Sequence, residues 1–427
     1  MDSKLIRDRW WFKLALLMAG MLAIYLRRPA FFHEPRFWAE EATRHFGYAY
    51  AQPWPAIFAY NYRGFFSLFN KVAALLAVHL VDLPHAPLVT TLLAFGVQIV
   101  PLALILWSES RPWDTLAGKV LGVSIVLFTL LSGEIWLNTV NSQFYLGLIA
   151  FLILLEDTSE TTRLRFGVHL ALLLLAGLTG MVSCFLTPLY AVKAWKERTR
   201  PSLVYLAAMA ACSAVQLAVL LSSGGQWAGR GQGLQPVLIP PVVWVKTIVL
   251  PLFGPAAARR FAEFVLAVRD LGALPFGALS AFLALAVVVF WTVLLWKACT
   301  YRRLLILGSY VLVVVLSIVG SIGADKSGMI HAWNGQRYFY VPSVMLLALM
   351  LSRIELDGSR YHKVVSAVCA ALVVTSIIVG VVHYRGTVIA GSDWPKWREE
   401  VAKWELDHSY ALQVWPKGWQ VELAPRE

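Results

Sequence analysis

The sequence predicts an all-α polytopic membrane protein of about 11–13 transmembrane helices, with a helical first external loop. Hydrophobic residues make up 59% of the 427 residues, and charged residues only 15%. Long apolar segments recur along the whole chain, which is not typical of a soluble globular protein of this length. The net charge of +12 comes mostly from cations clustered between these segments, which indicates topology signals rather than a nucleic-acid-binding surface.

The candidate helices are the apolar segments whose length approaches the ~20 residues that a bilayer requires. The first segment follows Lys4, Arg7 and Arg9 and shows no small-residue cleavage site, so we expect a retained helix rather than a removed signal peptide. In chain order the segments are 10–26, 64–82, 86–107, 118–133, 143–155, 166–180, 181–194, 201–221, 241–255, 274–296, 304–323, 338–352 and 363–382.

Three basic clusters, at 193–200, 297–303 and 353–363, set the expected orientation. Cytoplasmic loops carry an excess of Lys and Arg, so we place these clusters inside. The first loop, 27–63, then lies outside, and the segments 64–82 and 241–255 do not fully cross. We therefore expect a transmembrane domain over 1–383, which includes the first external loop, and an external tryptophan-rich tail over 384–427.

The first external loop holds two adjacent acids, Glu40 and Glu41. If residues 34–47 form an α-helix, Glu40 faces Arg44 and Glu41 faces His45, both at i,i+4 spacing. One interpretation is a solvated helix with two weak surface ion pairs. The other is a catalytic site in which one carboxylate takes a proton from an acceptor group.

A second polar stretch, 134–143, falls on the same side in this topology. It carries Asn138, Asn141 and Gln143, whose amides both donate and accept hydrogen bonds and so suit hydroxyl-rich ligands and phosphate oxygens. Helix capping explains the same residues without a ligand.

A third polar stretch, 325–340, leads directly into an apolar helix. Arg337 stands at the start of that helix, where the macrodipole favours an anion beside it, and a guanidinium grips phosphate with two donors. An arginine that extends to the lipid headgroups is the alternative. His331 and Tyr338 are expected to line the same site.

A glycine-rich stretch, the C-terminal tail and the cysteines are open to ordinary structural interpretations as well as functional ones. The stretch 222–233 is either a mobile lid or an ordinary loop. The tail alternates tryptophan with charge, which predicts interfacial anchoring or, more specifically, a carbohydrate-stacking or lid role. Cys184, Cys212, Cys299 and Cys369 have no ligand-like spacing and indicate neither a disulfide nor a metal site.

Three short motifs carry a resemblance to a known family. They are Trp38-Ala39-Glu40-Glu41, the pair Trp136-Leu137-Asn138 and Asn141-Ser142-Gln143, and Gln336-Arg337-Tyr338. With the layout of the spans, they resemble the GT-C superfamily of integral membrane glycosyltransferases. More narrowly, the chain is similar to bacterial members that decorate lipopolysaccharide O-antigen or other surface polymers from polyprenyl-phosphate sugars.

The resemblance implies an inverting transfer, with an acidic residue of the first external loop as the general base. Many relatives have Glu-Asp or Asp-Glu there, whereas this chain has Glu-Glu, so the base stays open between the two. We expect Glu41 before Glu40, because Arg44 can pair with Glu40 while His45 can orient Glu41. Arg337 is expected to bind the donor phosphate.

The expected protein is thus a multi-pass enzyme of the bacterial inner membrane whose active site faces the periplasm. Its partners would be a polyprenyl-phosphate-linked sugar donor, a surface glycan or protein acceptor, and the lipid bilayer, with no nucleic acid. No cofactor is expected, and the acids are too few to support a divalent-metal cage.

The alternatives are a transporter or flippase of lipid-linked glycans, and a polymerase of surface polysaccharide. A pump or channel would more often place ionisable groups at mid-membrane depth. Here Lys71, His79 and Lys246 are the doubtful cases of that kind.

Overall fold

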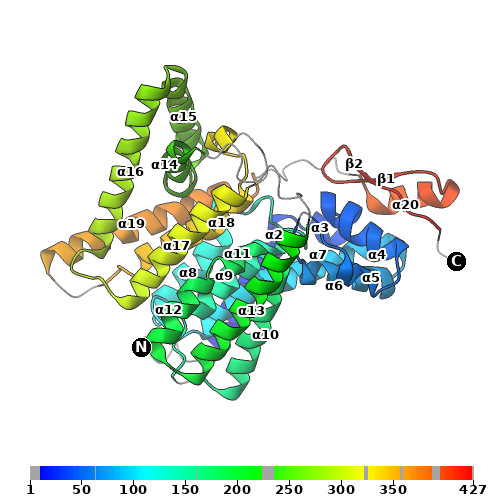
Figure 1. The fold of residues 1–427 in the computed structure, drawn as a ribbon, viewed down its shortest axis with the longest axis horizontal. Helices are drawn as coiled ribbons and strands as arrows, with labels where there is room; N and C mark the ends of the chain where they lie inside the picture. The colour runs from blue at the N-terminus through cyan, green and yellow to red at the C-terminus, as the bar shows by residue number, and fades with distance from the viewer. Residues whose placement is uncertain are drawn as a thin grey trace.

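The computed structural model describes residues 10–62, 64–159, 161–223, 235–321, 326–355, 359–386 and 395–425. Their regular structure is almost entirely helical, and one antiparallel hairpin joins β1 (Leu412–Val414) to β2 (Trp419–Val421) (Figure 1). Several of the helices are long and apolar enough to cross a bilayer. The predicted all-α polytopic membrane fold is therefore confirmed.

The helices succeed one another along the chain with short connections. They are α2 (Trp10–Arg27), α3 (Ala30–His33), α4 (Gly47–Ala51), α5 (Ala56–Ala59), α6 (Leu68–His79), α7 (Ala86–Trp107), α8 (Leu116–Phe128), α9 (Ser142–Leu155), α10 (Arg163–Thr179), α11 (Met181–Cys184), α12 (Thr187–Glu197), α13 (Arg200–Ser222), α14 (Ile239–Val243), α15 (Leu250–Asp270), α16 (Ala273–Leu295), α17 (Tyr301–Gly320), α18 (Arg337–Leu351), α19 (Arg360–Val382) and α20 (Trp397–Leu406). Two π-helical turns, η1 (Glu41–Phe46) and η5 (Trp244–Val249), and four 3₁₀ turns, η2 (Leu83–His85), η3 (Leu130–Ser132), η4 (Pro236–Leu238) and η6 (Lys326–Ile330), complete the set.

Among the described residues, seven helical runs are long and apolar enough to cross a membrane. An eighth is added if Arg163–Thr179 and Met181–Glu197, which are bent by 114° relative to each other, form one broken span. Four further apolar helices, α6, α8, α9 and α18, are shorter. These four fall below the length of a candidate span, so the described residues hold seven or eight such spans where the sequence predicted 11–13. Nearly every residue of α9 and α18 is buried among other helices.

The two doubtful segments of the sequence differ in the structure. Helix α6 has 12 residues, or roughly 18 Å at the rise of an α-helix, which is too short for a ~30 Å hydrocarbon core. This length agrees with the expectation that 64–82 does not cross. Segment 241–255 instead belongs to a 35-residue apolar run, Pro236–Asp270, whose length permits crossing, so the same expectation finds no support there.

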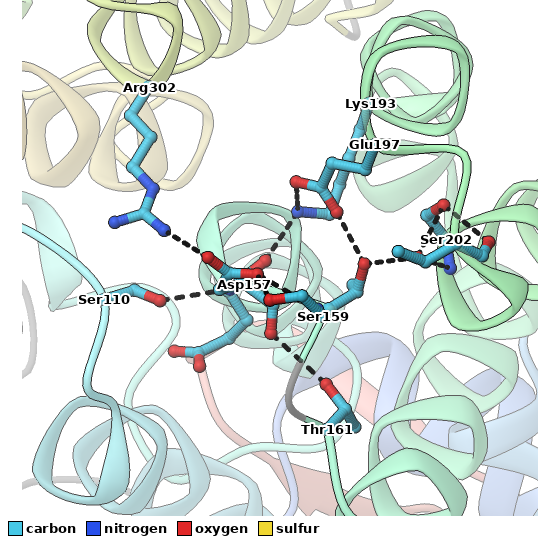
Figure 2. Close-up of polar contacts among 11 residues, drawn as sticks. Ser110, Asp157, Ser159, Thr161, Lys193, Glu197, Ser202 and Arg302 are labelled. Carbon is cyan, nitrogen blue, oxygen red and sulfur yellow. Dashed lines mark hydrogen bonds and ion pairs between the residues drawn. The ribbon is translucent and has the colours of Figure 1, made fainter.

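The three basic clusters meet at one end of the helices, as the topology predicts. Lys193 and Arg302 both reach the segment that follows α9 (Figure 2). Helices α9 and α18 both end near these contacts and begin at the other end of the bundle, so the cations are separated from the first loop by the length of these helices. The contacts are Lys193 Nζ to the Glu156 carbonyl at 2.5 Å, Arg302 to Asp157 at 3.3 Å, and Arg303 Nε to Ser352 Oγ at 3.3 Å.

At the opposite end the C-terminal tail packs onto the first loop (Figure 1), where β2 contacts η1 and α20 contacts η2. Trp397 and Trp404 are buried in a shared apolar cluster with Phe37 and Phe46. The Trp397 indole also donates to the Leu83 carbonyl at 2.8 Å. Burial inside the protein, rather than anchoring at the bilayer surface, therefore accounts for these two tryptophans.

Close helix packing gives the first prediction. A Cβ atom at Gly380 of α19 would lie 1.8 Å from the Phe128 carbonyl oxygen of α8, so Gly380→Ala has to push the two helices apart. We expect a loss of about 1–3 kcal/mol, seen as a lower melting temperature of the purified protein in detergent.

Gly277→Ala is the matched control, because no heavy atom lies within 4 Å of a Cβ placed at Gly277 of α16. That variant should melt at the wild-type temperature or slightly above it, since alanine favours helix more than glycine does. Equal melting temperatures for the two variants would contradict the close contact.

Candidate functional site

A pocket lies where the first loop, α6, α9, α11, α17 and α18 meet, at the end of the bundle that carries the tail. Its volume is about 100 Å³, below the ~300–1,000 Å³ of small-molecule sites, so a sugar enters only if lining side chains move. Walls from α11 and α17 are mainly apolar. Six of the residues predicted from the sequence line it together, namely Glu40, His45, Asn141, Gln143, Arg337 and Tyr338.

Glu40 and Arg337 supply opposite charges to this pocket. Both side chains are partly exposed, and the Glu40 carboxylate is close enough to interact electrostatically with the Arg337 guanidinium. The guanidinium carbon also lies 5.2 Å from the centre of the Tyr338 ring. An acid and a cation from segments almost 300 positions apart therefore share one cavity.

The N-terminus of α18 already has an anion beside it. Glu134 Oε2 accepts a hydrogen bond from the backbone N–H of Arg337 at 3.1 Å, and its charge also acts on the guanidinium. The helix start thus holds a protein carboxylate where the sequence suggested room for a bound phosphate. Only the Arg337 side chain, and not the helix end, is left for a phosphate.

Glu41 has a different environment from Glu40. Its side chain is 2% exposed and does not line the pocket. One oxygen accepts from the backbone N–H and the hydroxyl of Thr139, at 2.8 and 2.6 Å, and the other from the Trp38 N–H at 2.9 Å. Burial raises the pKa of Glu41, although these donors and nearby Arg36 oppose that effect. The geometry therefore favours Glu40 over Glu41 as an acid that meets a substrate, which reverses the expected order.

The predicted i,i+4 pair of Glu41 and His45 does not form, and the helix of the loop has another pitch. Residues Glu41–Phe46 form a π-helical turn, whose backbone bonds connect i to i+5. The Arg44 guanidinium lies over the ring of Tyr62, 5.2 Å from its centre, and the Glu41 oxygens are taken by Trp38 and Thr139 rather than by His45. The helical first loop is present and Glu41 does not pair with His45, while the pairing of Glu40 with Arg44 stays a prediction.

His45 lines the pocket as a buried imidazole. Its Nδ1 has no hydrogen-bond partner among the described residues. Burial, helped by the charge of Lys71, lowers the pKa of His45 to about 4. The ring is therefore neutral near pH 7, and Nδ1 is available to a hydroxyl of a bound ligand.

The amides before α9 divide into two groups. Asn138 donates to the Glu134 carbonyl at 2.9 Å and accepts from the Asn141 backbone N–H at 2.9 Å, so it folds the loop and does not reach the pocket. Asn141 also bonds the Glu134 carbonyl, at 3.0 Å, but lines the pocket with Gln143. Hydrogen bonds within the loop thus account for Asn138, which does not cap α9, while Asn141 and Gln143 are placed to contact a ligand.

His331 does not join the site. It is exposed and lines a separate cavity with Arg259 and Glu263, and its carbonyl accepts from Lys246 Nζ at 2.6 Å. The expectation that it lines the pocket is therefore wrong, because the buried Lys246 holds this turn against η5. Most of the suggested lid, 224–233, lies outside the described residues.

Sequence reasoning missed Tyr62, Asn70 and Ser317, which also line the pocket. Asn70 donates to Ser67 Oγ at 2.7 Å, while its Oδ1 is buried without a hydrogen-bond partner among the described residues. The sequence signal that could have identified Asn70 was its position beside Lys71 in an otherwise apolar segment. No cluster of three or more His, Cys, Asp or Glu side chains suited to a metal occurs in the described ranges.

Comparison of the sequence with protein-family models and with curated proteins gives no match.

The bonds of Glu41 give a prediction about stability. In Glu41→Gln an NH₂ group replaces one carboxylate oxygen, so a buried donor of Trp38 or Thr139 loses its acceptor. We expect destabilisation by about 1–3 kcal/mol, measured by thermal melting in detergent. Glu40→Gln is the control and should change the melting temperature less; a larger change for Glu40→Gln would contradict the structural role of Glu41.

The low pKa of His45 gives a prediction about pH. The unfolded chain binds a proton at His45 near pH 6.5, whereas the folded protein binds it only near pH 4, so stability is lost as pH falls through this window. His45→Gln should lose less melting temperature than the wild type between pH 6.5 and pH 4. An identical pH dependence for the two proteins would show that His45 is not held neutral by the fold.

Proposed function

We propose that the protein is an integral membrane glycosyltransferase that moves a sugar from a polyprenyl-phosphate donor to a surface glycan or protein acceptor. The observation that supports this most is the pocket itself, in which Glu40 and Arg337 meet beside apolar helix walls. A base for the acceptor and a cation for the leaving phosphate are the two groups that such a transfer needs.

In the proposed step, Glu40 takes the proton of the acceptor hydroxyl as its oxygen attacks the anomeric carbon of the sugar. The bond from that carbon to the phosphate oxygen breaks, and polyprenyl phosphate leaves with the electron pair. Attack from the face opposite the phosphate inverts the anomeric configuration. Arg337 stabilises the negative charge that develops on the leaving phosphate.

The charges of the pocket suit this order of events. Arg337 already faces Glu40 and Glu134, so a phosphate that binds there adds negative charge beside Glu40. Arg337 is the cation placed to offset that added charge.

The walls of the pocket suit a lipid-linked donor. Val182 and Phe185 come from the α11 region, and Leu316 and Gly320 come from the last turn of α17. These helices belong to the apolar bundle, so the phosphate can bind Arg337 while the lipid chain stays among apolar side chains. In this proposal the enzyme belongs to the bacterial inner membrane with the pocket facing the periplasm, where nucleotide sugars are scarce.

The test uses Glu40→Gln in cells that lack the chromosomal copy. Surface glycans and glycoproteins are compared by mass spectrometry, and we expect Glu40→Gln to reduce the transferred sugar by about 10²–10⁴-fold, the usual contribution of a general base. Glu34→Gln, an exposed acid of the same loop whose contact with Lys396 is 3.7 Å, should transfer sugar normally.

Purified variants separate a transferase from a flippase. Undecaprenyl phosphate should raise the melting temperature of the wild type and of Glu40→Gln, but not of Arg337→Ala. A flippase or polymerase that needs no carboxylate would keep its activity in Glu40→Gln. Sugar transfer at the wild-type level in that variant would overturn the proposed role of Glu40.

A further inference from the structure

A second cavity lies between the first loop and the C-terminal hairpin. Its volume is about 470 Å³, within the ~300–1,000 Å³ of small-molecule sites. The loop contributes Thr43, Arg44 and Gly47, and the hairpin contributes residues 418–422. We call this cavity the hairpin groove.

The hairpin groove and the pocket use the same π-helical turn. Glu40 and His45 line the pocket, while Thr43 and Arg44 line the groove. The Arg44 guanidinium lies over the ring of Tyr62, which itself lines the pocket. Arg44 of the groove therefore contacts Tyr62 of the pocket, so the two cavities lie next to each other at this turn.

The chemistry of the groove fits a carbohydrate. Trp419 offers a partly exposed indole ring, and Thr43, Arg44, Gln420 and Glu422 offer both donors and acceptors around it. Polyhydroxylated rings need this combination of an aromatic face and mixed hydrogen-bonding groups. The exposed Arg44 and Glu422 carry opposite charges, so the lining residues do not present a single-sign surface for a polyanion.

The fold holds the groove in place. Glu400 of α20 accepts from the Tyr410 hydroxyl at 2.7 Å and from the Gln413 N–H at 2.9 Å, which fixes the start of the hairpin. The Trp415 carbonyl accepts from the Ala39 N–H at 2.6 Å, one residue before Glu40. A preformed site of this kind binds without first ordering its own loops.

We propose that the hairpin groove binds the acceptor polysaccharide and leads its end toward Glu40. This inference rests on the proposed function for the identity of the acceptor, and on the groove itself for the binding of carbohydrate. The tail would then act as the acceptor-binding element of the enzyme, with Trp419 as its stacking residue.

The experiment measures binding apart from sugar transfer. The probe is surface polysaccharide isolated from cells lacking the protein, and its affinity for the purified full-length chain is measured in lipid nanodiscs. Trp419→Ala should bind about tenfold more weakly, and Trp419→Phe should restore most of the affinity because it keeps an aromatic face. Trp54→Ala, which removes a 63% exposed tryptophan of the first loop outside the groove, should bind as the wild type does.

Each outcome decides the question. Failure of the wild type to bind, or equal binding by Trp419→Ala, overturns the proposal, as does binding that survives periodate oxidation of the sugar rings. If Glu40→Gln still transfers sugar while Trp419→Ala loses binding, the proposed function fails and the groove stands as a polysaccharide site. If Glu40→Gln is inactive while Trp419→Ala binds normally, the proposed function is supported and the groove is not the polysaccharide site.

Discussion

The buried carboxylate of Glu41 is the interaction on which the site depends. It accepts three hydrogen bonds, two from Thr139 and one from Trp38, and so joins the first loop to the segment that precedes α9. A charge buried in this way is tolerated only when its oxygens are satisfied. With Glu41 fixed inward, the adjacent Glu40 is the acid that lines the pocket. Of the two adjacent acids, Glu41 thus joins two segments of the fold and Glu40 lines the pocket.

The tail completes this arrangement from the other side. Ala39 has a φ of 21°, which a residue with a side chain rarely adopts, and its N–H is held by the Trp415 carbonyl. The Arg36 guanidinium, whose carbon is 4.6 Å from the centre of the Trp415 ring, packs between the loop and the tail. A backbone conformation that is unfavourable alone persists because surrounding contacts determine it. The position of Glu40 is therefore set by residues almost 380 positions later in the chain.

Much of the fold could be predicted from the sequence, because apolar length and basic clusters act locally. Arg302 and Lys193 contact the same segment at one end of the bundle, as basic clusters expected on one side of the spans should. The choice between Glu40 and Glu41 could not be predicted, since it depends on a π-helical turn and on Thr139, which lies far along the chain. His331 was misplaced for a similar reason, because no spacing rule shows that Lys246 holds its turn elsewhere.

The position of the pocket along the helices follows from where an apolar bundle can supply hydrogen-bond partners for polar groups. Helices α9 and α18 bury nearly all their side chains, so the pocket lies at their ends, where Glu134 accepts from the N–H of Arg337 at the start of α18. On the proposed function, a site at helix ends would meet an amphipathic donor at the level where its phosphate leaves the hydrocarbon. A water-soluble acceptor has to arrive from the opposite direction, over the loop and the tail. On the proposed function, the pocket would therefore receive the donor from the membrane, and the hairpin groove would receive the acceptor from the aqueous side. The two cavities would serve these two substrates on the two faces of one short π-helical turn.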